Sequence, residues 1–254
     1  MPLPTLVLIL AAVAIVSLVS FVGVFALFLH KRLEKILTYL ISFAAGALLG
    51  VAFLDLLPES LEIFPNNKAL LIALFGIIMF FTIEAFLHWH HHHTHKHEEP
   101  HHIHSVGYLN LFADGLHNFI DGMVIAAGFL ISPHLGVVTT IAAILHEVPQ
   151  EFGDFSILIY SGFKKTKALF FNFLSALTAV AGALFVYFWG SMFDSLNNYL
   201  IPFAAGGFIY IAAVDLLPEL RQHESKEIMQ SILQLILIVL GIFIIWAAGN
   251  YIKI

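Results

Sequence analysis

Two short segments of the chain gather the side-chain types that bind metal ions. DGLHNFIDG (residues 114–122) carries two acids, a histidine and an asparagine, and LHEVPQEFGDF (145–155) carries a histidine, a glutamine and three acids. If both segments are helical, at 100° per residue the donors of the first cover an arc of about 100° and those of the second about 140°. Each helix then presents one polar stripe to a partner or to a cavity.

The donor types favour a divalent first-row metal. Imidazole and carboxylate without thiolate suit Zn, Fe, Mn, Co or Ni, and the chain has no cysteine. A lone histidine in a membrane more often serves packing or a proton relay, but two histidines with several acids on facing stripes favour a metal path. Three pairs lie four residues apart and therefore share a helix face: His117 with Asp121, His146 with Gln150, and Glu147 with Glu151.

The composition places these stripes in a membrane. Hydrophobic residues make up 60 % of the 254 residues and charged residues 11 %, whereas about a quarter of a soluble domain is charged. So few charges cannot cover a surface that faces water. We therefore expect an all-α integral membrane protein whose partners are the lipid bilayer and a metal ion, with no nucleic acid.

Eight stretches are long and apolar enough to cross the hydrocarbon as helices, which takes about 20 residues each. Their predicted bounds are 4–29, 36–60, 68–89, 106–131, 135–161, 166–190, 197–220 and 227–250. The breaks carry charges or turn residues, such as HKRLEK, FPNNK and GFKKTK. The chain thus divides into spans 1–3 (1–89), a histidine-rich loop (90–105), the metal-binding spans 4 and 5 (106–161) and spans 6–8 (162–254).

The basic residues predict which way the chain faces. Loops 1, 3, 5 and 7 share one side of the membrane and hold nine of the eleven Lys and Arg residues, which leaves Lys68 and Lys253 for the other side. Loops rich in Lys and Arg face the cytosol. We therefore predict a multi-pass protein of the cell membrane (plasma or inner membrane), with both termini outside and the histidine-rich loop cytosolic.

A repeat links the second and seventh spans. FAAGALLGVAFLDLLPE (43–59) matches FAAGGFIYIAAVDLLPE (203–219) at ten of 17 positions. Because the two spans run in opposite directions, this is typical of transporters built from inverted repeats, whose binding sites lie near the midplane. Shared use of small residues for helix packing is the alternative. We expect an inverted repeat that relates spans 1–3 to spans 6–8 around the central spans 4 and 5.

Ten acidic residues lie within or at the ends of the predicted spans, and no Lys or Arg lies within the apolar stretches. A carboxylate at mid-bilayer costs about 2.5–3.5 kcal/mol, so protons or a metal cation must neutralise the group. Acids at the interface can stay hydrated instead, which is an alternative for Glu59, Glu219 and Asp154. The full set is Asp55, Glu59, Glu84, Asp114, Asp121, Glu147, Glu151, Asp154, Asp215 and Glu219.

The segment HWHHHHTHKHEEPHHIH (88–104) holds ten histidines. Unstructured imidazoles bind metal weakly and reversibly, so the tract predicts a loop that collects or senses metal. A solvated linker with incidental affinity is the alternative. Its candidate ligands are His90, His91, His92, His93, His95 and His97.

HNFIDG followed by HEVPQE, together with the histidine-rich loop and the DLLPE repeat, resembles the ZIP (Zrt/Irt-like) family of metal transporters. The resemblance covers nearly the whole chain and is to the branch with a histidine-rich loop between spans 3 and 4. It implies eight spans, an outside N-terminus, usually a homodimer, and import of a divalent metal into the cytosol. Zn²⁺ is the expected cargo, with Fe²⁺, Mn²⁺ and Cd²⁺ as alternatives.

The resemblance also implies a binuclear centre between spans 4 and 5. Its main site would use His117, Asp121, His146 and Gln150, and the adjoining site would use Asn118, Asp121, Glu147 and Gln150.

Two departures from the family pattern bear on these sites. Gln150 stands where many relatives have His or Glu, so its neutral amide binds more weakly and Glu151 is expected to compensate. Ala179 stands near the place where span 6 of some relatives supplies an acid. We therefore expect one strong site and one weak site. Residues expected along the route are Asp55, Asp114, Asp154 and Asp215.

Two other functions stay open on the sequence alone. HEVPQ is similar to the HExxH helix of an intramembrane zinc protease, but Gln150 replaces the second histidine and Pro149 distorts the helix that must present both ligands. A metal exporter or a membrane metal sensor would use the same ligands. The sequence favours a transporter and not an enzyme.

Overall fold

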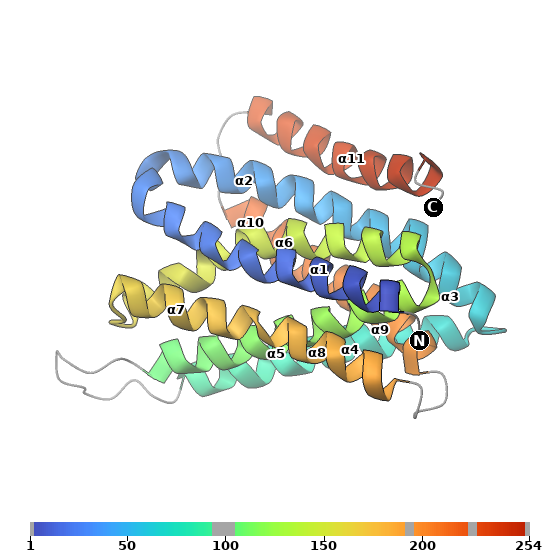
Figure 1. The fold of residues 1–254 in the computed structure, drawn as a ribbon. Coiled ribbons are helices and arrows are strands. Elements are labelled where there is room, and N and C mark those ends of the chain that lie inside the picture. The colour runs from blue at the N-terminus through green and yellow to red at the C-terminus, as the bar shows by residue number, and fades with distance from the viewer. Residues whose placement is uncertain (1–2, 93–104, 191–195, 223–227, 252–254) are drawn as a thin grey trace.

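The computed structural model describes residues 3–92, 105–190, 196–222 and 228–251, and every regular element within them is a helix. The long helices lie side by side as one bundle (Figure 1). The prediction of an all-helical chain is therefore confirmed. In chain order the elements are α1 (Leu3–Val19), η1 (Ser20–Phe25), α2 (Ala26–Val51), η2 (Ala52–Leu56), α3 (Leu57–Ile63), α4 (Lys68–His92), α5 (Ser105–Ile131), α6 (Pro133–Tyr160), α7 (Lys165–Ala176), α8 (Thr178–Trp189), α9 (Leu196–Tyr210), η3 (Ile211–Leu216), α10 (Leu217–Gln222) and α11 (Ile228–Tyr251).

Six helical stretches among the described residues are long and apolar enough to cross a membrane. They are Pro4–Phe25, Thr38–Ile63, Lys68–Ala85, Lys165–Trp189, Leu196–Leu216 and Ile228–Ala247. The outer faces of α4 and α11 expose large apolar side chains, such as Leu71 at 63 % and Leu235 at 61 %. A lipid environment accounts for these faces, because such side chains on neighbouring turns would form a large exposed apolar patch in water, which promotes aggregation.

The two helices that carry the polar stripes are not among the six, because their polar side chains lower the hydropathy. They are nevertheless long: α5 has 27 residues and α6 has 28, which at 1.5 Å per residue is about 40 Å each. They lie in the interior of the bundle, where α5 packs against α4, α6, α7, α8 and α9, and α6 packs against α1, α2, α5 and α7. Their polar faces are thereby kept from lipid.

A one-residue connection holds α5 and α6 side by side. Ser132 separates the helices, and its Oγ accepts a hydrogen bond of 3.1 Å from the Leu135 N–H, which caps α6. Pro133 follows at the first helical position, where a missing N–H costs nothing. The tight turn places the middle of α5 opposite the middle of α6.

Glycines bring α5 and α8 into backbone contact. A Cβ atom on Gly122 would lie 1.9 Å from the Ala179 carbonyl oxygen, and one on Gly182 would lie 2.0 Å from the Phe119 carbonyl oxygen. Close approach through small residues is how helices associate in a membrane, where no hydrophobic force drives them together. Gly122 belongs to the DGLHNFIDG segment, so the same segment supplies candidate metal ligands and the close contact between α5 and α8.

The first break in the bundle differs from the prediction. HKRLEK was expected to be the loop between spans 1 and 2, but α2 begins at Ala26 and runs through this segment, and the chain turns instead at η1. Gly23 lies in η1, where an added Cβ would be 2.7 Å from the Phe155 Cβ, so a residue without a side chain lets the turn pack against α6. Lys, Arg, Leu and Glu are good helix formers, and nothing in HKRLEK stops the helix.

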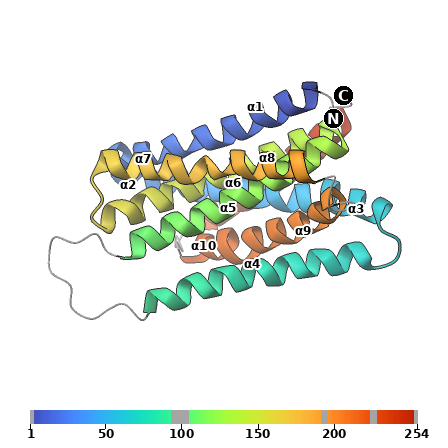
Figure 2. The same cartoon turned by 60° about the horizontal axis from the view of Figure 1, so that its bottom comes forward.

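The two copies of the sequence repeat share an unusual backbone. η2 and η3 are π-helical turns, and they fall at matching places in the copies, with Asp55 in η2 and Asp215 in η3. Each is followed by the proline of DLLPE, which cannot donate to the carbonyl four residues earlier. α2 and α9 run in opposite directions along the bundle in both views (Figures 1 and 2). Matching π-helical turns are rare enough to point to a functional position in both copies.

Candidate metal centre between α5 and α6

Four donor atoms from the middle of α5 and α6 meet at one point. His117 and Asp121 lie one turn apart on α5, and His146 and Glu147 are neighbours on α6. One ligand atom from each of the four side chains lies within 4.8 Å of all the others. Asp121 and Glu147 are buried, with 3 % and 1 % of their side chains exposed, and His117 is 16 % exposed. We call this group the main cluster.

The separations in the main cluster fit a single zinc ion. Ligands about 2.05 Å from a tetrahedral zinc lie about 3.4 Å from one another. His146 Nε2 is 3.1 Å from His117 Nε2 and 3.0 Å from Asp121 Oδ2. His117 Nε2 is 3.5 Å from Glu147 Oε1 and 3.9 Å from Asp121 Oδ2, and His146 Nε2 is 3.8 Å from Glu147 Oε1. The observed range brackets the tetrahedral value.

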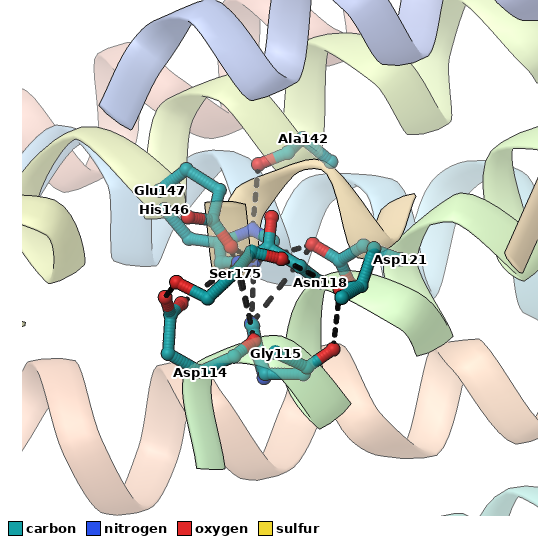
Figure 3. A network of polar contacts seen from close by, with 10 residues as sticks. Asp114, Gly115, Asn118, Asp121, Ala142, His146, Glu147 and Ser175 are labelled. Carbon is teal, nitrogen blue, oxygen red and sulfur yellow. Dashed lines mark hydrogen bonds and ion pairs between the residues drawn. The ribbon is translucent and has the colours of Figure 1, made fainter. Parts of the chain in front are cut away.

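The donor atoms of the main cluster are not used up by hydrogen bonds to the rest of the protein. His146 Nδ1 is 2.9 Å from the Ala142 carbonyl oxygen, which can only accept, so Nδ1 carries a proton and Nε2 can present a lone pair to a metal. Asp121 Oδ2 and Glu147 Oε1 are buried and have no hydrogen-bond partner in the described part of the chain. Figure 3 shows His146, Asp121 and Glu147 pointing toward one another. Buried carboxylate oxygens without partners are costly, and a cation would satisfy both.

A second group of donors adjoins the first through Glu147. Asp114, Glu147 and Glu151 each offer an oxygen within 4.8 Å of the others, and all three are buried. We call them the acid trio. Its donors are all carboxylate oxygens, without imidazole.

A cavity of about 630 Å³ opens beside both groups. Its wall includes His117, His146 and Asp114 from the clusters, and Asp154 and Asp215 farther along. Asn110 Nδ2 donates a 3.0 Å hydrogen bond to Asp154 Oδ1, one turn beyond the acid trio on both helices. Polar groups therefore continue along the seam between α5 and α6 from the main cluster into the cavity.

Most of the residues selected from the sequence lie at this centre. His117, Asp121, His146, Glu147 and Glu151 belong to the two groups of donors. Gln150, Asp114, Asp154 and Asp215 line the cavity. Asn118 Nδ2 donates a 2.7 Å hydrogen bond to Asp114 Oδ1, and its own Oδ1 is buried without a partner among the described residues.

Asp55 lies apart from the centre. Its Oδ1 is 3.4 Å from His134 Nε2 at the start of α6, and neither residue is part of the cavity wall. The candidate ligands of the histidine-rich tract fall partly outside the described chain. His90, His91 and His92 complete the backbone of α4, and His93, His95 and His97 lie outside the described residues.

Several polar partners at the centre were missed by the sequence analysis. Ser175 Oγ donates to Asp114 Oδ2, and Asn172 Nδ2 donates to Glu151 Oε2. Tyr210 OH donates to Glu84 Oε2 at the cavity wall. The available signal was the spacing of Asn172 and Ser175, which places two polar residues on one face of an apolar helix.

The family model described as ZIP Zinc transporter matches residues 5–107 and 90–248. The chain belongs to the ZIP family. The resemblance noted in the sequence is thereby confirmed, and the family together with the apolar helices makes this ZIP chain a multi-pass membrane protein.

Curated relatives of this ZIP chain carry related names. It is 36 % identical over 223 residues to "Zinc transporter ZIP13" of Pongo abelii, which covers 82 % of this chain and 65 % of the relative. It is 41 % identical over 154 residues to "Zinc transporter zipt-7.2" of Caenorhabditis elegans. It is 48 % identical over 136 residues to "IAA-alanine resistance protein 1" of Arabidopsis thaliana. The chain spans 29 % of the plant relative and 33 % of the nematode one.

Proposed function

We propose that this ZIP chain carries divalent metal ions, zinc first of all, across the membrane into the cytosol through the centre between α5 and α6. The observation that carries the proposal is the main cluster: two imidazoles and two carboxylates converge at the separations of one zinc coordination sphere. The names of several relatives as zinc transporters support the choice of cargo. Fe²⁺, Mn²⁺ and Cd²⁺ are further candidates, because the same ligands accept them.

The shape around the centre supports alternating access. Most of the cavity wall comes from the second halves of α4 and α6, the first half of α5 and the η3 turn. These lie toward the end of the bundle where α4 ends and α5 begins. Toward the opposite end the helices pack tightly. Buried residues there are Val124, Ile125, Ala126, Ala127, Leu135, Val138, Ala142, Ala143, Ile201, Ala204, Ala205 and Phe208. A path open at one end and closed at the other is what a carrier needs.

The positive-inside rule assigns the open end to the cytosol. Lys164, Lys165 and Lys167 lie at that end, where α7 begins, whereas Lys68 lies at the other end, at the start of α4. Under this assignment both termini are outside and the histidine-rich loop is cytosolic, where His90, His91, His92, His93, His95 and His97 would collect released metal. The cell membrane is the proposed location.

Eight spans and an inverted repeat complete the proposed architecture. α5 and α6 join the six apolar stretches as spans 4 and 5, since each is long enough and shields its polar face within the bundle. The opposite directions of α2 and α9 and the matching π-helical turns support the inverted repeat. The division into residues 1–89, 90–105, 106–161 and 162–254 follows from this plan. A homodimer stays a prediction, which the mass of the detergent-solubilised protein can test.

Zinc flux in proteoliposomes tests the proposal. The wild-type protein and Ser42→Ala should move zinc down an imposed gradient, because the buried Ser42 hydroxyl donates its hydrogen bond within its own helix, to the Thr38 carbonyl oxygen. Asp121→Ala and His146→Ala should abolish the flux. Equal flux in all four proteins would refute the site.

The same assay separates the competing functions. Flux only from the cytosolic face outward indicates an exporter, and binding without flux indicates a sensor. Cleavage of a membrane substrate that is lost in Glu147→Gln indicates a protease. Each of these results would replace the proposed function.

A further inference from the structure

An apolar groove lies between α4, α5 and α9, on a lipid-facing side of the bundle. It has a volume of about 640 Å³, and all of its lining side chains except those of Lys68 and Tyr199 are apolar. α4 lies at the edge of the bundle beside α9 (Figure 2). Leu71 and Phe75 on the groove wall are 63 % and 57 % exposed, so no described part of the chain covers them. We call this space the lateral groove.

Close packing of α4 on α9, without an equivalent contact to α5, produces the lateral groove. A Cβ atom added to Gly206 would lie 2.0 Å from the Ala73 carbonyl oxygen, so α4 and α9 are in backbone contact. The glycines within α5 pack toward α6, α7 and α8 instead. On the side of the groove, α5 presents three large side chains, Leu116, Ile120 and Met123. The space between the α4–α9 pair and α5 is therefore walled by hydrocarbon.

The lateral groove is long enough for one lipid tail. On α4 its wall runs from Lys68 to Ile83, which is about 22 Å at 1.5 Å per residue. The hydrocarbon core of a bilayer is about 30 Å thick, so the acyl chains of one leaflet reach about 15 Å into it. Lys68 begins the apolar stretch of α4 and so belongs at the membrane surface. An acyl chain can therefore lie along α4 from the surface to the midplane.

The mouth of the lateral groove carries an unneutralised positive charge. Lys68 Nζ donates a 2.7 Å hydrogen bond to Tyr199 OH and lies 4.6 Å from the centroid of the Phe64 ring. No ion pair joins Lys68 to a carboxylate within the described part of the chain. An ammonium has three N–H donors, so two remain after the bond to Tyr199. Lys68 is also the first residue of α4, where the positive end of the helix dipole lies.

We propose that the lateral groove binds one anionic phospholipid, whose phosphate contacts the Lys68 ammonium and whose acyl chain lies along α4 against α5 and α9. Charge complementarity at the mouth and the match between groove length and leaflet depth support this occupant. A zwitterionic lipid fits less well, because its own cation would be repelled by Lys68 and by the start of α4. The inference goes beyond the proposed function and does not depend on it.

The bound tail would lie close to the metal route. Leu116 and Ile120 of α5 line both the lateral groove and the cavity beside the main cluster. They directly precede His117 and Asp121 in the sequence. One layer of side chains therefore separates the lipid from the route, and the lipid packs against the helix that supplies two of the candidate ligands.

Native mass spectrometry of the whole chain, delipidated in detergent, tests the inference. The probes are phosphatidylglycerol and phosphatidylcholine with identical acyl chains. The wild type should retain one phosphatidylglycerol per chain and prefer it over phosphatidylcholine by about fivefold, as one lysine near an anionic headgroup provides. Lys68→Gln should bind the two lipids equally. If Lys68 and Tyr199 only anchor their helices at the interface, the wild type will show no such preference, which would overturn the inference.

Matched variants separate the groove from the rest of the surface. Lys165→Gln removes the same charge from an exposed lysine at the other end of the bundle and should keep the preference. Phe75 and Phe81 are both 57 % exposed on α4, and only Phe75 lines the groove. Phe75→Ala should bind both lipids at least about threefold more weakly, because the tail loses packing contacts. Phe81→Ala should bind them as the wild type does.

A photoactivatable phosphatidylglycerol with a diazirine in the middle of one acyl chain locates the lipid on the wild-type protein. Cross-links should concentrate on the groove face of α5, at Leu116, Ile120 or Met123. Cross-links spread over α11 and the Phe81 side of α4, with none on that face of α5, would indicate unspecific surrounding lipid and overturn the inference. A dimer that retains neither lipid would assign the groove to a second copy of the chain and would overturn it as well.

Discussion

At the candidate metal centre, neighbouring groups determine how each side chain can bind a metal ion. The Ala142 carbonyl fixes the tautomer of His146, so this imidazole is ready to bind metal without a change of protonation. Phe80 meets the His117 ring edge-on with centroids 6.3 Å apart, and Phe208 lies 5.8 Å from the His146 ring. These aromatic rings pack beside the imidazoles, which also line the cavity.

The sequence pointed to the four side chains of the main cluster but not to the neutral residues that contact their neighbours. Histidines and acids in a membrane span attract notice because each is costly there, and four of them form the main cluster. Asn172 and Ser175 were not predicted, because a neutral side chain in an apolar helix can satisfy itself locally, as Ser42 does. Asn118 was predicted as a ligand, and its 2.7 Å hydrogen bond to Asp114 became visible only in the folded chain.

Gln150 offers a prediction at the residue scale. It lines the cavity beside His146 and presents a neutral amide where an imidazole would bind zinc more tightly. Gln150→His should therefore raise zinc affinity by about tenfold and lower the maximal rate of uptake, because release slows. Binding titration and initial-rate uptake on the same preparation measure the two effects. Weaker binding in this variant would show that position 150 does not face the metal.

Among the elements, helix identity followed from hydropathy, but the irregular turns did not. The bounds of α4 and α11 agree with the predicted spans because their apolar content defines them, and those of α5 and α6 agree although polar side chains interrupt their apolar pattern. The sequence analysis placed the first break at HKRLEK instead of at η1. The charged segment is itself a good helix former, and the turn at η1 depends on the tight contact of Gly23 with α6. The π-helical turns depend on packing between helices distant in sequence, as η2 packs on α9 and η3 on α2.

The contact between α5 and α8 gives a prediction at the element scale. Gly122→Ala would place a Cβ 1.9 Å from a backbone oxygen that cannot move alone, so the two helices must separate and the protein should lose about 3 kcal/mol or more of stability. Thermal unfolding in detergent measures the loss.

A matched control lies on α6. An added Cβ at Gly153 meets nothing within 4 Å, so Gly153→Ala should hold the wild-type Tm or raise it slightly, because alanine favours a helix by about 1 kcal/mol over glycine. Equal Tm values for the two variants would contradict the proposed close packing.

For the whole molecule, the account requires one end of the route to be open and the other to be sealed. Ser156 lines the cavity and Lys68 is exposed at the opposite end. The chain has no cysteine of its own, so Ser156→Cys and Lys68→Cys each introduce a single reactive thiol. A membrane-impermeant thiol reagent applied to intact cells should label Lys68→Cys only, and applied to inside-out vesicles should label Ser156→Cys. The reverse pattern would invert the proposed orientation.

The central claim is that one metal ion sits among His117, Asp121, His146 and Glu147. The most direct measurement is anomalous scattering at the zinc absorption edge from crystals of the protein soaked in zinc. The account predicts a peak within about 2.2 Å of both Nε2 atoms and of Asp121 Oδ2, and its absence in crystals of His146→Ala. A zinc-soaked crystal of the wild type with no peak between α5 and α6, or with its strongest peak elsewhere in the bundle, would contradict it.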